Sequence, residues 1–238
     1  MDISEDLLSS IRTDFEKSYN ENEQVQICFE RLTEGTATYQ DAAVFSNSVG
    51  NMLSEAYLAN ITAENLPNET LYYNICKKVL EPTLTENFDR VTSYTANVQT
   101  GLNKALGMGL KGIKAKLDKN MIVNLIDKIT DSPLLSDILW LFDAPVKNFV
   151  DSTVDKTLKA NIDFQARSGL EPIIKRTAEI GECAWCSKLE GTYRYSETPA
   201  DVYRRHDRCR CVVEYIGEGR NELVHGNQVG KMRKKSRA

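Results

Sequence analysis

The chain has 238 residues, of which 41% are hydrophobic and 27% charged, a composition typical of a folded protein rather than a disordered one. No apolar run approaches the roughly 18–20 residues that cross a bilayer, so we expect no membrane partner. The net charge of −4 is uneven, because residues 201–238 carry +5 and residues 1–200 carry −9. The acidic first residues do not resemble a signal peptide, so we expect a reducing compartment, where clustered cysteines bind metal more often than they form disulfides.

Residues 1–167 have helical patterning. Apolar residues recur at helical spacing from Ile3 onward, and Ser4 is placed to act as the N-cap of this first helix. The polar residues 20–23 interrupt the apolar stripe. A short second helix follows, and Gly35 is expected to end it.

A capping box predicts the start of the third helix. Thr38 and Asp41 have the spacing of the motif, with Asp in place of the usual Glu, and the apolar pattern then continues to Leu58. Another helix is expected over residues 71–80, and Pro82 is expected to stop it, since proline removes a backbone donor and clashes with the preceding turn.

Residues 85–130 lack proline and roughly keep helical phase, but glycines interrupt them at about 1 kcal/mol each relative to alanine. The pattern predicts one long helix with a weak middle, or two helices, and the glycines can also serve close packing. Two prolines then bracket the apolar residues 134–142, which are interpreted either as core or as an exposed docking surface for another subunit.

The character of the chain changes after residue 168. Residues 173–177, 191–195 and 211–216 are rich in strand-forming side chains. We therefore predict an α+β, mainly α fold with three parts. These are a large helical domain (residues 1–167), a small zinc-stapled, β-containing C-terminal module (168–220) and a basic, disordered tail (221–238).

Inside that module, a stretch of 29 residues contains four of the six cysteines and one of the two histidines. The pattern C-x2-C followed by H-x2-C-x-C predicts a tetrahedral Zn²⁺ site. Because every candidate is Cys or His and no open position is evident, the site is expected to be structural. The candidate ligands are Cys183, Cys186, His206, Cys209 and Cys211.

Five candidates compete for four positions, which leaves alternatives. An all-cysteine site would leave His206 outside the coordination sphere. A site of three cysteines and His206 would leave one of the pair Cys209 and Cys211 as a partner of a coordinated sulfur. A metal-free reduced cluster and a pair of disulfides are the remaining alternatives.

The other cysteines and histidine carry simpler interpretations. Cys28 and Cys76 lie in helical patterns and are expected to be small buried residues, whereas His225 is expected at the surface. Four arginines near His206 can offset the negative charge of thiolates or bind phosphate; they are Arg204, Arg205, Arg208 and Arg210.

Motifs of common enzyme classes are missing from the sequence. It has no metalloprotease His-Glu-x-x-His and no phosphate loop, and Glu182 stands where a zinc deaminase needs proline. Residues 107–112 match Gly-x-Gly-x-x-Gly but follow a helical pattern rather than a strand, which disfavours a dinucleotide site. We therefore expect no catalytic residues, no organic cofactor and no small-molecule substrate.

Several motifs within residues 168–216 resemble one family. They are Gly169-Leu170-Glu171-Pro172-Ile173-Ile174, Cys183-Ala184-Trp185-Cys186, Gly191-Thr192-Tyr193 and Tyr203-Arg204-Arg205-His206-Asp207-Arg208-Cys209-Arg210-Cys211. This set resembles the C-terminal module of phage minor head proteins, the head-morphogenesis (Mu F-like) group of tailed phages and prophages of Gram-positive bacteria. The helical N-terminal part agrees with the layout of that group but carries no diagnostic motif.

The resemblance implies a low-copy structural protein inside the capsid near the portal. Its implied partners are the portal protein and the major capsid protein, and its implied location is the virion, with the host cytoplasm during assembly. Contact with packaged DNA, or ejection with it, is a further expectation. The alternative is a small zinc-dependent nucleic-acid-processing enzyme or effector, which an open, water-bearing metal site would favour.

The last eight residues, 231–238, include five basic groups. Such a segment is either a solvated terminus or a non-specific contact to nucleic-acid phosphate.

Overall fold

The computed structural model describes residues 3–178, 184–206 and 208–218. His225 and residues 219–238, including the basic tail, lie outside this described part, and so does Cys183. The helices are α1 (Ile3–Glu21), α2 (Glu23–Glu34), α3 (Tyr39–Asn60), α4 (Tyr73–Ala105), α5 (Lys119–Thr130), α6 (Leu135–Ile138), α7 (Ala144–Arg167) and α8 (Ala184–Lys188). The strands are β1 (Pro172–Thr177), β2 (Gly191–Arg194) and β3 (Val212–Glu218), so the fold is α+β and mainly α, as predicted.

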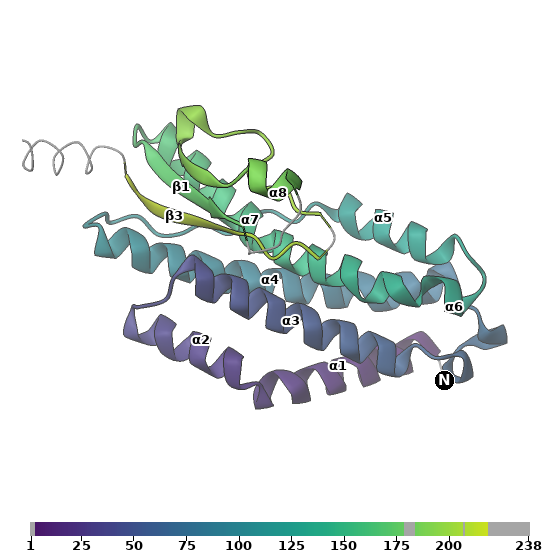
Figure 1. Cartoon of the computed structure of the whole chain (residues 1–238). Helices are drawn as coiled ribbons and strands as arrows, with labels where there is room; N and C mark the ends of the chain where they lie inside the picture. The colour runs from purple at the N-terminus through teal and green to yellow at the C-terminus, as the bar shows by residue number, and fades with distance from the viewer. Residues whose placement is uncertain (1–2, 179–183, 207, 219–238) are drawn as a thin grey trace, which may run out of the picture.

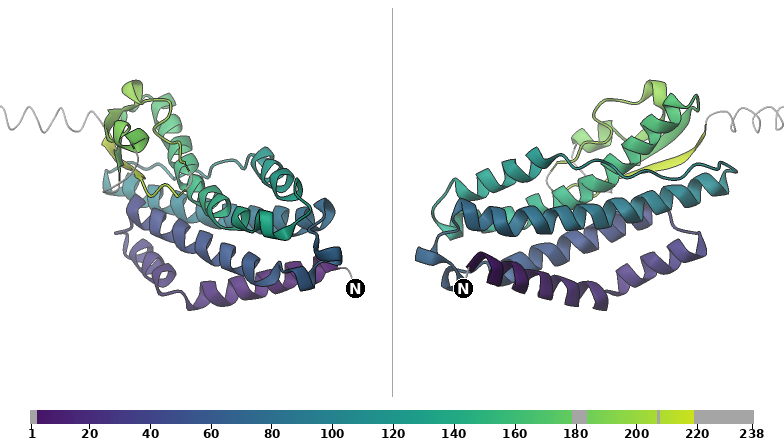
Figure 2. Two further views of the ribbon diagram at one scale, coloured as in Figure 1. Left: turned by 45° about the vertical axis from the view of Figure 1, so that its right-hand side comes forward. Right: turned by 180° about the vertical axis from the view of Figure 1, so that it is seen from behind.

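The helices form a layered body with the sheet at one end. Helices α3, α4 and α7 pack against one another, α1 lies against α3 and α4, and α5 lies along α4 (Figure 1). The sheet sits beside α7, on the side of the body away from α1 and α2, as the turned views in Figure 2 also show. In the described part of the chain, no helix is both long and apolar enough to cross a membrane.

The N-terminal helix boundaries follow local capping. Asn22 accepts a hydrogen bond from the Val25 amide at 3.0 Å, and Gly35 ends α2 at a φ of 73°. The capping box of Thr38 and Asp41 is present, which confirms that prediction. The N-cap role predicted for Ser4 is wrong, because α1 includes Ser4 and buries its side chain.

The predicted stop at Pro82 is also wrong, because α4 runs through it for 33 residues. Leu80 and Leu84 on either side are fully buried, so core packing offsets the lost backbone hydrogen bond. The hydroxyl of Thr83 donates to the Val79 carbonyl at 2.7 Å and the hydroxyl of Thr85 to the Glu81 carbonyl at 2.6 Å, which supplies carbonyls around the proline with donors.

Residues 85–130 form two helices joined by a non-helical strap, residues 106–118. Gly107, with a φ of 73°, follows the end of α4. The strap then runs along α4 and is bonded to it and to α7: the Gly112 amide donates to Thr100 Oγ1 at 2.8 Å, and Asn161 exchanges two hydrogen bonds with Ile113. The Gly-x-Gly-x-x-Gly match lies in this strap after a helix, not between a strand and a helix.

The apolar residues 134–142 divide between core and surface. Ile138, Leu141 and Phe142 are buried, whereas Leu134 and Trp140 are 61% and 59% exposed. The core interpretation therefore holds for the buried part of the segment, and docking of another subunit on the exposed part stays a prediction.

The sheet is antiparallel with strand order β2-β1-β3, and β1 is central. Its apolar face joins the core of the helices, because Ile174, Val213 and Tyr215 belong to the same buried cluster as the residues of α3, α4 and α7. Helix α7 ends at Arg167 and the apolar core continues past this point into the sheet, so the division into domains near residue 168 stays a prediction.

Candidate metal centre

Three of the five candidate ligands converge at the end of the sheet. Cys186 lies on α8, and His206 and Cys209 lie in the segment that leads into β3. Their ligand atoms all lie within 4.8 Å of one another, and the two sulfurs are buried. This cluster can hold a metal ion.

The distance between the two sulfurs fits coordination of one shared ion, whereas the distance between Cys186 and His206 would have to increase. Two sulfurs bound to one tetrahedral ion at about 2.3 Å lie about 3.8 Å apart. The Sγ atoms of Cys186 and Cys209 are 3.8 Å apart. Cys186 Sγ and His206 Nε2 are 2.9 Å apart, a hydrogen-bond distance, whereas a shared ion would separate them to about 3.6 Å.

A tight turn brings His206 and Cys209 side by side. The Cys209 amide donates to the His206 carbonyl at 3.1 Å, the bond that closes a four-residue turn. Arg208, the third residue of this turn, has a φ of 60°, which is unusual for a side chain other than glycine. The backbone therefore adopts a costly conformation at the point where it aligns two ligands.

Of the other two candidate ligands, the structure describes Cys211 but not Cys183. Cys211 is buried in the same small cluster as Cys186 and Cys209, but its sulfur is not among the converging atoms. Both Cys209 and Cys211 precede β3, which begins at Val212, one residue after the start predicted for this strand. Cys183 lies outside the described residues.

Burial raises the pKa of the Cys209 thiol, because the apolar surroundings disfavour the thiolate, while the Cys211 backbone amide lowers it by bonding to the sulfur. Without a cation the thiol form is therefore favoured, and a bound divalent ion would convert it to the thiolate. The Cys211 contact fits the alternative in which one of the last pair supports a coordinated sulfur. Cys28 and Cys76 are buried among helices away from the cluster, as predicted.

A buried arginine that sequence reasoning missed underlies the cluster. Arg176 on β1 is 1% exposed, and its Nη2 lies 3.8 Å from Cys186 Sγ and 3.9 Å from Cys209 Sγ. Strand alternation was the available signal, since Arg176 lies two residues after the buried Ile174 and so on the same face of the strand.

The four arginines near His206 differ in burial and contacts. Arg204 is exposed and pairs with Asp201 at 3.0 Å, and Arg208 and Arg210 are also exposed. Arg205 is buried and forms a two-bond ion pair with Asp155 of α7, with Nη2 3.1 Å from Oδ1. Its Nη1 also donates to the Cys209 carbonyl at 3.3 Å, so Arg205 ties the ligand turn to the helical body.

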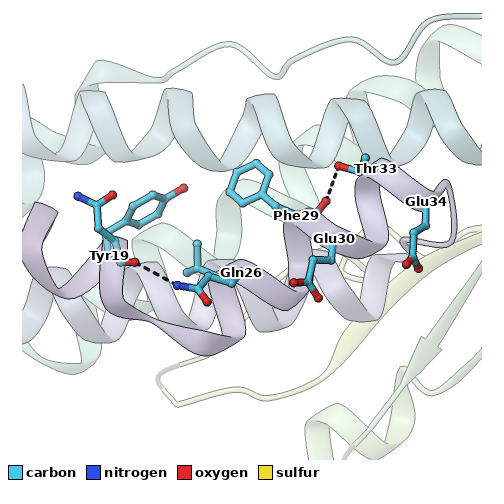
Figure 3. Close-up of a pocket in the computed structure, with 8 residues that line it drawn as sticks. Tyr19, Gln26, Phe29, Glu30, Thr33 and Glu34 are labelled. Carbon is cyan, nitrogen blue, oxygen red and sulfur yellow. Dashed lines mark hydrogen bonds between the residues drawn. The ribbon is translucent and has the colours of Figure 1, made fainter.

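Two hollows on the surface differ in how they lie relative to the candidate ligands. A groove of about 680 Å³ lies between α3, α7 and the ligand segment, and Lys147, Asp151, Arg208, Cys209 and Cys211 are among the residues that line it. A shallower hollow of about 660 Å³ lies along α1 and α2 beside Tyr19 and Phe29, with Glu30 and Glu34 at its edge (Figure 3). Only the first adjoins candidate ligands.

Comparison with known proteins finds no matching family model, no matching curated protein and no matching solved structure. The assignment of function therefore rests on the residues and geometry of this chain.

Proposed function

We propose that this chain is a phage minor head protein whose C-terminal module is stapled by a zinc ion. The observation that carries the proposal is the convergence of Cys186, His206 and Cys209. These residues belong to the segments that resemble the C-terminal module of that family. Two cysteine sulfurs, both buried, and an imidazole suit zinc better than magnesium or calcium, which prefer oxygen ligands.

The proposed role of the metal is structural. The module contributes three short strands and one turn of helix, so a metal bond between α8 and the turn before β3 holds together segments that share little local structure. Structural zinc in small modules supplies an apparent binding free energy of about 10–16 kcal/mol. Its loss should therefore loosen the module while leaving the helical body folded.

The partners of this proposal are the portal protein and the major capsid protein. Leu134 and Trp140 are exposed apolar side chains of the helical body, and tryptophan is among the residues that most often anchor a partner. Purified phage particles provide the test. Quantitative mass spectrometry should find the chain at low copy number inside the particle, and its absence from particles that contain portal and capsid proteins would contradict the proposal.

The second candidate is a zinc-dependent enzyme that acts on nucleic acid. What favours it is the groove beside Cys209 and Cys211, which contains cationic side chains that can contact phosphate. Metal-loaded protein incubated with single- and double-stranded DNA distinguishes the candidates. Turnover that chelator abolishes supports the enzyme, and bound zinc without turnover supports the structural role.

The basic tail is proposed to contact packaged DNA without sequence preference. Five charges in residues 231–238 can release up to five counterions, which gives a salt slope of about −0.9 for each charge engaged. We predict that deletion of residues 231–238 flattens the salt dependence of DNA binding while the zinc content stays unchanged. Binding measured between low and physiological salt checks this. An unchanged slope would move the contact to the exposed Arg204, Arg208 and Arg210.

A further inference from the structure

Arg176 is a charged side chain enclosed by the module. Its Nη1 donates to the carbonyls of Val202 and Arg204, the latter at 3.0 Å, and these carbonyls belong to the loop before His206. Its Nη2 faces the two sulfurs of Cys186 and Cys209. The guanidinium therefore links β1, the loop that carries His206 and both converging thiols.

The aromatic ring of Trp185 encloses the same group. The guanidinium carbon of Arg176 lies 5.5 Å from the centre of the Trp185 ring, and that ring meets His206 edge-on with centroids 6.0 Å apart. The enclosure matters because a buried cation is costly unless negative charge or hydrogen bonds offset it. Arginine cannot escape that cost by losing its proton.

Among the described residues, no carboxylate bonds to Arg176. Within the described ranges its hydrogen bonds go to carbonyl oxygens and to sulfur atoms. The thiolates of a metal-loaded site are the anions that it faces. The total charge of the loaded site therefore depends on how many thiolates it contains.

The charge balance distinguishes the ligand sets that the sequence left open. A divalent ion with two thiolates and a neutral imidazole has no net charge, so Arg176 would remain an uncompensated buried cation. With three thiolates and His206 the metal site has a charge of −1, which Arg176 cancels. Four thiolates without the imidazole would leave a net buried charge of −1 even with Arg176.

We propose that the zinc site uses three cysteine thiolates and His206, and that Arg176 is its positioning residue and counter-charge. This inference rests on the proposed zinc site and adds to it the identity of the fourth ligand as a third cysteine. Arg176 donates N–H···S hydrogen bonds to Cys186 and Cys209. Its bonds to the carbonyls of Val202 and Arg204 hold the loop from which His206 reaches the ion.

Substitution of Arg176 tests its role. Arg176→Met removes the charge and the hydrogen bonds, and Arg176→Lys keeps the charge but loses the planar donor fork. Loss of a group that supports metal ligands weakens metal binding by about 10–100-fold. We expect this loss in Arg176→Met and a smaller one in Arg176→Lys, measured by competition with a chromophoric chelator. Arg194→Met in the same module removes a half-exposed pair with Glu171 and should change affinity by less than about 2-fold.

Cobalt substitution separates a contact to sulfur from a general effect on folding. N–H···S bonds withdraw electron density from a coordinated thiolate, so their loss should move the thiolate-to-cobalt charge-transfer band to lower energy. If Arg176→Met does not fold, the band of Arg176→Lys is compared with that of wild type at the same content of bound cobalt. Wild-type affinity and an unshifted band in the variant that folds would overturn the inference while leaving the zinc site standing. Absence of metal from the wild-type chain would overturn both.

The third thiolate has its own test. We expect that either Cys183→Ser or Cys211→Ser removes one of three coordinated thiolates. That variant should show a weaker thiolate-to-cobalt charge-transfer band and a lower affinity for zinc. If both variants keep the wild-type intensity, the site has only two thiolates and the charge argument is wrong.

Discussion

Arg205 joins the ligand turn to the helical body through a buried ion pair with Asp155, whose side chains are 7% and 3% exposed respectively. Burial alone lowers the pKa of Arg205, but the charge of Asp155 and the bonds to it more than offset this, and the pKa lies above its usual value. The ion pair therefore anchors the turn before β3 to α7, and each of its two charges needs the other because both are buried.

We predict that Arg205→Met lowers the free energy of unfolding by about 3–5 kcal/mol, because it leaves the carboxylate of Asp155 buried without a partner. The neighbouring Arg204→Met removes an exposed pair and should cost less than about 1 kcal/mol. Denaturant unfolding checks both. The double variant Arg205→Met, Asp155→Leu should recover most of the loss, and equal effects of the two single variants would contradict the anchor.

Asp151 lies one turn before Asp155 on α7, and its carboxyl is a second titratable group close to Arg205. Burial raises the pKa of its carboxyl, and Arg205 and the Ser46 hydroxyl, which donates at 2.8 Å, offset only part of this. A raised carboxyl pKa means that the folded state holds the proton more tightly than the unfolded chain. The stability it contributes is present below the unfolded pKa and is lost as the pH rises through the folded pKa.

Asp151→Asn should therefore be more stable than wild type at neutral pH, since it keeps an acceptor for Ser46 and cannot ionise. The difference in melting temperature between variant and wild type should grow as the pH rises from about 4 to 7. Asp131→Asn at the exposed end of α5 makes the same charge change as a control. A difference that shrinks with rising pH would contradict this account.

At the scale of elements, the strap between α4 and α5 depends on one glycine. A Cβ on Gly112 would lie 2.1 Å from the Ala96 carbonyl oxygen of α4, a distance that atoms cannot reach without moving the backbone. A Cβ on Gly101, inside α4, would meet nothing within 4 Å. The two glycines therefore serve different purposes.

We predict that Gly112→Ala destabilises the chain by at least about 1–3 kcal/mol through forced separation of strap and helix. Gly101→Ala should stabilise it by about 0.5–1 kcal/mol, because alanine loses less backbone entropy in a helix. Thermal melts compare the two directly. If both substitutions changed the melting temperature in the same direction, the strap would not lie closely on α4.

Local signals in the sequence predicted most of these elements and missed the ones that tertiary packing decides. Gly35 and the capping box at Thr38 act through neighbours in the chain, so the end of α2 and the start of α3 were readable. Pro82 was misread, because burial of the leucines around it, which no local pattern reports, keeps α4 continuous.

The residues of the candidate site also divide into those that local sequence patterns indicate and those that only the fold brings together. Ligand spacing in the sequence indicated Cys186, His206 and Cys209 as candidates, because metal ligands often cluster along the chain, and the structure brings these three together. Arg176 comes from a strand distant in sequence, and only the fold brings it to the sulfurs, although strand alternation indicated that it faces inward. The partner of Arg205 lies 50 residues away on α7 and carried no local signal.

At the scale of the whole molecule, the helical body and the sheet share one apolar core, and the candidate metal-binding cysteines form a separate small buried cluster. Loss of metal should therefore affect the module around α8 and the ligand turn more than the helices. The central claim is that Cys186, His206 and Cys209 hold a single zinc ion.

Metal content per chain tests this claim most directly, measured by elemental analysis after purification under reducing conditions. Wild type and Cys28→Ser should each contain about one equivalent of zinc, because Cys28 is a buried thiol far from the cluster. Cys209→Ser should contain much less, and chelator should lower the melting temperature of the first two proteins but not of Cys209→Ser. Wild-type protein with metal far below one equivalent and a melting curve that chelator leaves unchanged would contradict the account.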